Sequence, residues 1–264
     1  MRTQSPATVL ALAFGLSFSA TPMMGASPKA PATVTAKANA NANVVEPAAL
    51  QALKKMSDYL GTLATFEINT DTTLDVVTVN GQRLQLGGNA HYKVRRPDAF
   101  QIDVVGDFRS RRFYFDGKQF TIFAPKLGYY ATEAAPPTIR EALDIIYNKY
   151  GIALPLEDLF RWSDPDSPRA QKMTSGFLVG PATIGGTATD HYAFREGDKD
   201  WEIWIQQGEQ PLPRKLVIVD RSDSARPAYV ARLTWNTRPT LVAEDFTFKP
   251  GADAKAIHLA MLGK

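Results

Sequence analysis

Residues 74–86 read Leu-Asp-Val-Val-Thr-Val-Asn-Gly-Gln-Arg-Leu-Gln-Leu, two stretches with alternating hydrophobic and polar residues on either side of Asn80-Gly81. Hydrophobic residues at every second position are typical of a strand with one buried face. Asn-Gly between two such stretches is a strong hairpin signal, because both turn residues need a positive φ. This stretch therefore predicts an antiparallel hairpin and favours a β-rich fold.

The same strand pattern continues on both sides of this hairpin. A second hairpin is predicted for residues 111–123, where Asp116-Gly117 forms the turn. Short strands at hairpin spacing, without a regular alternation of strands and helices, argue for one antiparallel sheet. The other predicted strands are 66–68, 89–95, 100–105, 176–179, 187–195, 201–207, 215–220, 229–235 and 246–248.

Three stretches predict helices. Residues 46–60 have Pro47 in the first turn and a hydrophobic stripe that ends before Gly61. Thr138 and Glu141 have the spacing of a capping box, and the helix that they begin ends at Gly151. A shorter helix is expected at 155–162. The fold class that results is α+β: a curved antiparallel sheet with an N-terminal helix and helices inserted mid-chain that cover its concave face.

The first 45 residues predict export rather than part of the fold. Arg2 is followed by an uncharged hydrophobic run and then by small residues, which is the pattern of a signal peptide; we assign it to 1–26. Residues 27–45 are rich in Ala, Pro, Thr, Lys and Asn, and are expected to form a disordered linker. Residues 46–264 are then a single domain, and the expected location is the periplasm.

Composition excludes several classes of protein. The 264-residue chain has no Cys, which rules out disulfides, thiolate metal sites and cysteine nucleophiles. Its 30 basic and 27 acidic residues are interspersed, so we expect no nucleic-acid partner. No later segment is apolar for long enough to cross a membrane, so the mature chain is expected to lack a transmembrane segment. We also expect a monomer.

The sequence contains no motif of catalysis or of metal binding. There are three histidines. His91 and His191 lie in predicted strands, and neither has a second His, Asp or Glu at ligand spacing with a third group nearby; His258 lies in the C-terminal tail. No phosphate-binding loop, nucleophile elbow or zinc motif occurs. We therefore expect no enzyme activity, no cofactor and no metal.

Hydrophobic and aromatic residues carry the remaining signal. They cluster in the central strands, on the mid-chain helix and in the strand at 201–207. Two interpretations stay open: a filled hydrophobic core, or the lining of a cavity for an acyl chain. The candidate lining residues are Phe113, Phe115, Phe120, Ile122, Ile139, Leu143, Ile146 and Trp204.

Three stretches, taken in order, resemble the bacterial lipoprotein-carrier superfamily with the LolA/LolB-like fold. Residues 88–100 resemble its strand that ends in Arg-Pro and is followed by an aromatic residue. Residues 112–125 are similar to its Asp-Gly-Lys hairpin with an aromatic strand, and residues 245–250 to its closing Phe-x-Phe-x-Pro strand. Within the superfamily, the chain resembles predicted periplasmic proteins to which no role is assigned.

This resemblance implies an incomplete antiparallel β-barrel with a helical lid over an apolar cavity. Arg96 occupies the position of the arginine that tethers the lid in the carriers; the alternative is a surface ion pair at the end of a strand. The lid segment has added residues at 149–159, which is a departure from the carriers. Their cargo and membrane partners are therefore not transferred to this chain.

The sequence thus predicts a non-enzymatic periplasmic protein that binds a lipid, an acylated molecule or another apolar ligand between the curved sheet and the helical lid. One alternative is an interaction or sensor module in envelope signalling, with an envelope protein as its partner. A less favoured alternative is a secreted hydrolase, which predicts a polar cleft that holds a perturbed carboxylate or histidine.

Overall fold

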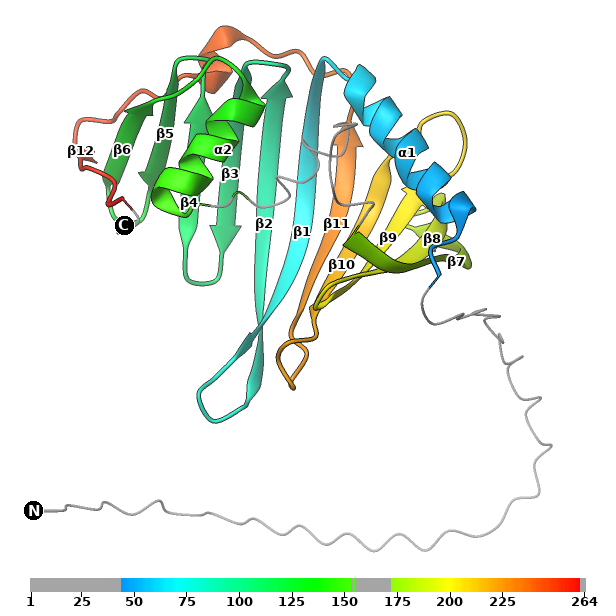
Figure 1. The fold of residues 1–264 in the computed structure, drawn as a ribbon. Coiled ribbons are helices and arrows are strands. Elements are labelled where there is room, and N and C mark those ends of the chain that lie inside the picture. Colours follow the sequence, from blue (N-terminus) through cyan, green and yellow to red (C-terminus); the bar gives the residue numbers. More distant parts are fainter. Residues whose placement is uncertain (1–43, 153, 155–171, 262–264) are drawn as a thin grey trace, which may run out of the picture. The chain divides into compact units, whose positions relative to one another are not determined.

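The computed structural model describes residues 44–152, 154 and 172–261, all of which fall in one compact unit, Ala36–Lys264. They form one curved sheet of 12 strands, two α-helices and a 3-10 helix (Figure 1). The helices are α1 (Pro47–Thr62), α2 (Ile139–Tyr150) and η1 (Ala243–Phe246). The strands are β1 (Thr65–Val77), β2 (Arg83–Arg95), β3 (Ala99–Gly106), β4 (Ser110–Phe115), β5 (Gln119–Ala124), β6 (Tyr129–Ala134), β7 (Met173–Ile184), β8 (Thr187–Glu196), β9 (Lys199–Gln206), β10 (Pro213–Asp220), β11 (Ala228–Asn236) and β12 (Lys255–Ala256).

The sheet consists of two meanders that meet where β1 pairs with β11. Its strand order is β12-β6-β5-β4-β3-β2-β1-β11-β10-β9-β8-β7. All neighbours are antiparallel except β12, which pairs parallel with β6. Strands β7 and β12 are the two edges, so the sheet is open, as the prediction of an α+β fold with an incomplete barrel requires.

The predicted hairpin at 74–86 is confirmed, but its strands are longer than expected. β1 and β2 pair continuously from Thr65–Arg95 to Val77–Arg83, so the separate strand predicted from residue 89 is part of β2. Gly88 lies within this strand and allows close packing, because a Cβ there would lie 3.1 Å from the carbonyl oxygen of Val105.

The mid-chain helix begins and ends as predicted. The Thr138 hydroxyl accepts a hydrogen bond from the Glu141 backbone N–H at 3.3 Å, which caps the first turn of α2. Gly151 ends the helix with a φ of 67°, a conformation that favours glycine. The predicted helix at 155–162 lies outside the described residues.

The end of the domain differs from the prediction. Residues 246–248 are not a strand: η1 ends at Phe246, and an extended segment without sheet pairing follows. The Asp245 carboxylate accepts a hydrogen bond from the Val242 backbone N–H at 2.9 Å, and this contact turns the chain. Strand β6 was missed by the sequence analysis, as was the attachment of Val44 and Val45, the last residues of the predicted linker, to Gly176 of β7.

Alternation along the strands divides the sheet into two faces. The inner face, which α1 and α2 cover, carries one row of side chains in register across β1 to β5: Phe66, Val94, Phe100, Phe115 and Phe120. These residues, together with Met56 and Leu60 of α1 and the α2 residues described below, form one hydrophobic core. The outer face carries mostly polar side chains.

Candidate functional site

Four of the residues predicted to line a cavity lie together on the inner face. Phe115 is directly opposite Phe120, and Phe113 is directly opposite Ile122, across strands β4 and β5. The Phe113 and Phe120 ring centroids are 6.2 Å apart, and the Phe100 and Phe115 centroids are 5.5 Å apart. The predicted aromatic cluster is therefore a continuous part of the hydrophobic core.

The predicted stripe on α2 packs onto the same core. Ile139, Leu143 and Ile146 are 5%, 2% and 2% exposed, and all three belong to the core cluster that contains the β4 and β5 aromatics. The helix itself is anchored at its start, because the Ile139 N–H donates to the Pro97 carbonyl oxygen at 2.8 Å. The structure thus brings seven of the predicted residues together beneath α2.

Trp204 lies on the opposite side of the sheet from these seven residues. Ile203 and Ile205 reach the core, so alternation directs Trp204 to the outer face. Its ring stacks on His191 with a centroid distance of 3.9 Å, and the Lys215 ammonium lies 4.1 Å above it. The sequence predicted that the apolar residues at 201–207 cluster together. Because successive side chains of β9 point to opposite faces of the sheet, Trp204 is separated from Ile203 and Ile205.

Arg96 follows β2 and lies on the inner side, close to the start of α2. Its guanidinium carbon is 5.7 Å from the centre of the Phe66 ring. Its Nε and Nη2 atoms are buried and have no hydrogen-bond partner in the described part of the chain. Burial lowers the pKa of Arg96, because the low-dielectric surroundings disfavour its charged form. Tethering of the lid by Arg96 stays a prediction, since residues 155–171 lie outside the described ranges.

Tyr229 is a second polar group within the inner face, and the sequence analysis did not identify it. It lies opposite Leu74 on β1 and Ile218 on β10. Its hydroxyl is buried and has no hydrogen-bond partner within residues 44–152, 154 and 172–261. Burial raises the pKa of Tyr229 to about 12. Among the residues that the structure describes, Arg96 and Tyr229 are thus two inner-face side chains with buried polar atoms that lack a hydrogen-bond partner.

Helices α1 and α2 leave part of the apolar surface of the inner face uncovered. Ile68, near the start of β1, is fully buried, whereas Leu74 and Val76 further along the strand are 46% and 38% exposed. Leu84, which pairs with Val76, is 42% exposed. We call these three residues the apolar rim. This uncovered strip of hydrophobic surface reaches the core through Tyr229, which lies opposite Leu74 and packs against the core cluster.

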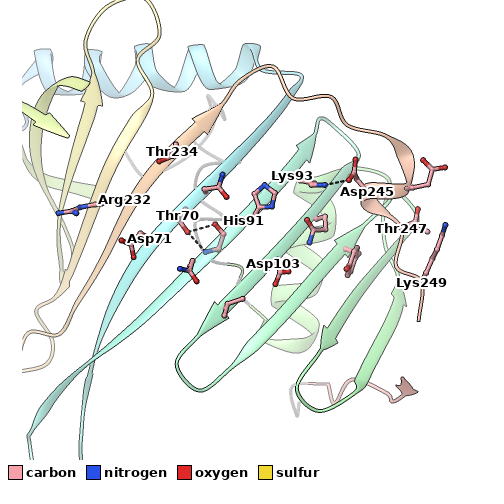
Figure 2. A pocket seen from close by; sticks show the side chains of 17 residues that line it. Thr70, Asp71, His91, Lys93, Asp103, Arg232, Thr234, Asp245, Thr247 and Lys249 are labelled. Carbon is pink, nitrogen blue, oxygen red and sulfur yellow. Dashed lines mark hydrogen bonds and ion pairs between the residues drawn. The ribbon is translucent and has the colours of Figure 1, made fainter. Parts of the chain in front are cut away.

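The outer face carries a polar groove of about 1120 Å³. Figure 2 shows its floor on β11, β1, β2 and β3, and one wall formed by the C-terminal segment 243–249. Lys93 forms an ion pair with Asp245 of that wall. The groove is lined by Asn69, Thr70, Asp71, Asn89, Ala90, His91, Lys93, Gln101, Asp103, Val105, Tyr114, Arg232, Thr234, Glu244, Asp245, Thr247 and Lys249.

Phe248 holds the C-terminal segment against the outer face. Its ring packs against Tyr114, Phe123 and Tyr130 at centroid distances of 5.4, 5.2 and 5.0 Å. This contact explains the apolar residues on both sides of β5: Phe120 and Ile122 face the core, while Phe123 lies beneath Phe248.

The groove presents acidic and basic side chains in nearly equal number, and several are already paired with protein groups. Asp103 binds Arg112 at 2.8 Å, and Lys93 binds Asp245. Within the described ranges, no group of three or more His, Asp or Glu residues is arranged to hold a metal ion. The sequence analysis missed this groove because its lining residues are spread from position 69 to position 249.

These observations define a class: an open, curved antiparallel sheet whose hydrophobic inner face is covered by an N-terminal and a mid-chain helix. Residues 49–260 match the family described as "Predicted periplasmic protein (DUF2092)", and the chain belongs to that family. This assignment agrees with the predicted periplasmic location. No helix in the described part of the chain is long and apolar enough to cross a bilayer.

Several solved structures are similar to this chain. They include lipoprotein LppX from Mycobacterium tuberculosis (15% identity, 74% of this chain and 98% of that one, TM-score 0.46) and LprF from Mycobacterium bovis (12%, 74% and 96%, 0.43). A LolA superfamily protein from Nitrosomonas europaea is also similar (10%, 76% and 97%, 0.34). No protein with a curated description matches the sequence.

Proposed function

We propose that this protein is a non-enzymatic periplasmic binding protein that holds a lipid, an acylated molecule or another apolar ligand between the inner face of the sheet and its helical cover. The observation that carries the proposal is the apolar rim. A soluble protein gains no stability from hydrophobic side chains that stay in water, and an exposed apolar surface continuous with a core is typical of a ligand-binding groove.

The partly buried residues beside the rim support the same function. Trp201, Ile218 and Tyr229 lie on β9, β10 and β11 and pack against the edge of the core without being fully covered. Together with the rim they continue the apolar surface across both meanders. A ligand that occupied this strip would bury side chains that the helices leave accessible.

The hydrophobic effect would supply most of the affinity for such a ligand. Each buried methylene contributes about 0.8 kcal/mol, so ten methylenes contribute about 8 kcal/mol, from which the cost of ordering ligand and protein is subtracted. In this proposal the α2 residues Ile139, Leu143 and Ile146 move away from the sheet during loading. Contacts with the ligand then replace those of the helix with Phe113, Phe115, Phe120 and Ile122.

The arrangement of the histidines favours binding over catalysis. Two histidines lie near a carboxylate: the Nε2 atom of His191 is 2.7 Å from Glu202, and that of His91 is 3.8 Å from Glu67. The His191 ring is stacked on Trp204, and no serine, threonine or lysine nucleophile is hydrogen-bonded to it within the described ranges. His191 and Glu202 are therefore placed for packing and a hydrogen bond rather than for attack on a substrate.

A fluorescent apolar probe tests this function. We expect N-phenyl-1-naphthylamine to bind the delipidated protein with a blue-shifted, enhanced emission, and phospholipids or fatty acids to displace it. The variant Leu74→Ser should weaken probe binding, whereas Val79→Ser at the fully exposed hairpin tip serves as the matched control. Absence of probe binding by folded, delipidated protein would overturn the proposal.

A further inference from the structure

The unpaired guanidinium of Arg96 is the least expected feature of the inner face. Buried charged groups are normally paired, because an unpaired charge in low-dielectric surroundings has a large desolvation cost. Here the Nε and Nη2 atoms are buried without a partner in the described residues, and the Phe66 ring is the aromatic contact. A single cation–π contact at 5.7 Å compensates only part of that cost.

The neighbouring residues do not supply the missing anion. Asp98 lies two positions further along the chain, but its carboxylate binds the Nε atom of Arg95 at 3.0 Å. Arg95 also lies over the Phe246 ring, at 5.0 Å, on the outer side of the sheet. Strand alternation therefore gives the carboxylate of this turn to Arg95 and leaves Arg96 on the inner side without it.

The two unpaired atoms form one edge of the guanidinium group. Nε and Nη2 are the pair that binds both oxygens of a carboxylate side-on, and another arginine of this chain shows that geometry. In Arg195, Nε donates to Oδ1 of Asp200 at 2.6 Å and Nη2 donates to Oδ2 at 3.0 Å. The open edge of Arg96 thus matches a bidentate acidic group.

We propose that the apolar ligand is an acidic amphiphile, an acyl chain with an anionic carboxylate or phosphate head group that pairs with Nε and Nη2 of Arg96. This inference rests on the function proposed above and names its ligand class. From the level of Phe66 to Leu74 the inner face of β1 extends eight residues, or about 26 Å at about 3.3 Å per residue. A long acyl chain that lies along it places its head group at Arg96 and its tail at the apolar rim.

Three probes with the same sixteen-carbon chain test the head group. Hexadecanoic acid, hexadecyl phosphate and hexadecan-1-ol are titrated against the delipidated, exported protein loaded with N-phenyl-1-naphthylamine. We expect at least one of the two anions to displace the dye at least tenfold more tightly than the alcohol does. The stronger of the two anions identifies whether the head group is a carboxylate or a phosphate.

Substitutions then connect the preference to Arg96. Arg96→Gln should reduce the affinity for the anion to that for the alcohol, and Arg96→Lys, which keeps the charge but loses the two-point edge, should keep part of the preference. Arg95→Gln, on the outer side of the same turn, is the matched control and should keep all of it. Circular dichroism establishes that each variant is folded.

The outcomes separate this inference from the proposed function. Equal affinity of the wild-type protein for the anions and the alcohol overturns the acidic head group while leaving apolar binding in place. If Arg96→Gln keeps the preference for the anions over the alcohol, the pairing of the head group with Arg96 is likewise overturned and apolar binding is again left in place. If none of the three probes displaces the dye, and the dye itself does not bind, both proposals are wrong.

Discussion

Arg95 and Arg96 are adjacent in sequence and lie on opposite sides of the sheet in different electrostatic surroundings. Arg95 binds Asp98 at 3.0 Å and lies over Phe246, whereas Arg96 lies over Phe66 with two buried, unpaired nitrogens. The pair stands where β2 ends and α2 begins. Arg95 is therefore neutralised on the outer side, whereas Nε and Nη2 of Arg96 on the inner side have no hydrogen-bond partner among the described residues.

The core beneath α2 predicts a large stability effect. Phe115 is fully buried in the row that joins β1 to β5, so Phe115→Ala should lower the free energy of unfolding by about 3–5 kcal/mol. Urea denaturation followed by tryptophan fluorescence measures the change. Phe108→Ala serves as a control, because Phe108 is 75% exposed, and its effect should stay within about 0.5 kcal/mol. Equal effects of the two substitutions would contradict the assignment of the core.

Removal of the Tyr229 hydroxyl should not destabilise the protein at neutral pH. The hydroxyl is buried without a partner in the described residues, so Tyr229→Phe removes an uncompensated polar group and should raise the free energy of unfolding by about 1 kcal/mol or leave it unchanged. Exposed Tyr147→Phe on α2 is the control. A clear loss of stability in Tyr229→Phe would show that the hydroxyl has a partner.

The raised pKa of Tyr229 predicts a pH dependence at the alkaline end. Burial holds the folded-state pKa near 12, above the ordinary value of 10.0, so ionisation is easier in the unfolded chain. Ionisation of Tyr229 therefore leaves the free energy of unfolding unchanged below pH 10 and lowers it as the pH rises from 10 through the folded-state pKa of about 12. Unfolding measured between pH 10 and 12 should therefore depend less on pH in Tyr229→Phe, with a residual dependence from Tyr92, whose pKa is also raised by burial.

The lowered pKa of Asp200 predicts that the free energy of unfolding falls at acid pH. Hydrogen bonds from Arg195, with the nearby charges of Arg221 and Arg226, hold the pKa of Asp200 below its ordinary value of 3.8. The contribution of these contacts to the stability of the folded protein is complete above the ordinary pKa of Asp200 and is lost as the pH falls through the lower folded-state pKa. Asp200→Asn should therefore lower stability at pH 7 and reduce its change between pH 4 and 2.

A surface ion pair provides the control for Asp200. Lys54 and Asp58 pair at 2.7 Å on α1, with side chains 73% and 62% exposed. Such exposed pairs contribute little, so Asp58→Asn should change the free energy of unfolding by no more than about 0.5 kcal/mol at either pH. If Asp200→Asn behaved like Asp58→Asn, the arginine cluster around Asp200 would not stabilise the fold.

The apolar rim predicts a change in binding without a change in stability. Leu74 is 46% exposed, so Leu74→Ser removes hydrophobic contact area for a ligand but little from the core. We expect about threefold to tenfold weaker binding of N-phenyl-1-naphthylamine, with a urea midpoint close to that of the wild-type protein. Unchanged probe binding in this variant would place the ligand elsewhere on the molecule.

Local patterns were sufficient to predict most of the strands, both hairpins and the ends of α2, but not β6 or the structure of residues 246–248. Alternation at 74–86 and the Thr138–Glu141 spacing describe contacts within a few residues, and those contacts form as expected. The seven inner-face residues followed from the same local patterns. Trp204 was assigned to the inner surface, although alternation between Ile203 and Ile205 directs it to the outer face, where it stacks on His191 of the neighbouring strand β8.

Features that depend on distant parts of the chain were beyond sequence reasoning. The outer groove joins residue 69 to residue 249, and its wall is held by Phe248 against three strands. The position of Arg96 followed from the Arg-Pro motif, but its unpaired edge depends on Asp98 binding Arg95 instead. Competition between neighbouring side chains for one partner is decided by the folded geometry.

Native mass spectrometry of the gently purified, exported protein, followed by organic extraction, tests the central claim most directly. The account predicts a mass above that of the polypeptide and an extract that contains a lipid or another acyl compound. A bare polypeptide mass and an empty extract, together with no uptake of an apolar probe, would contradict it and favour a filled core with a protein partner.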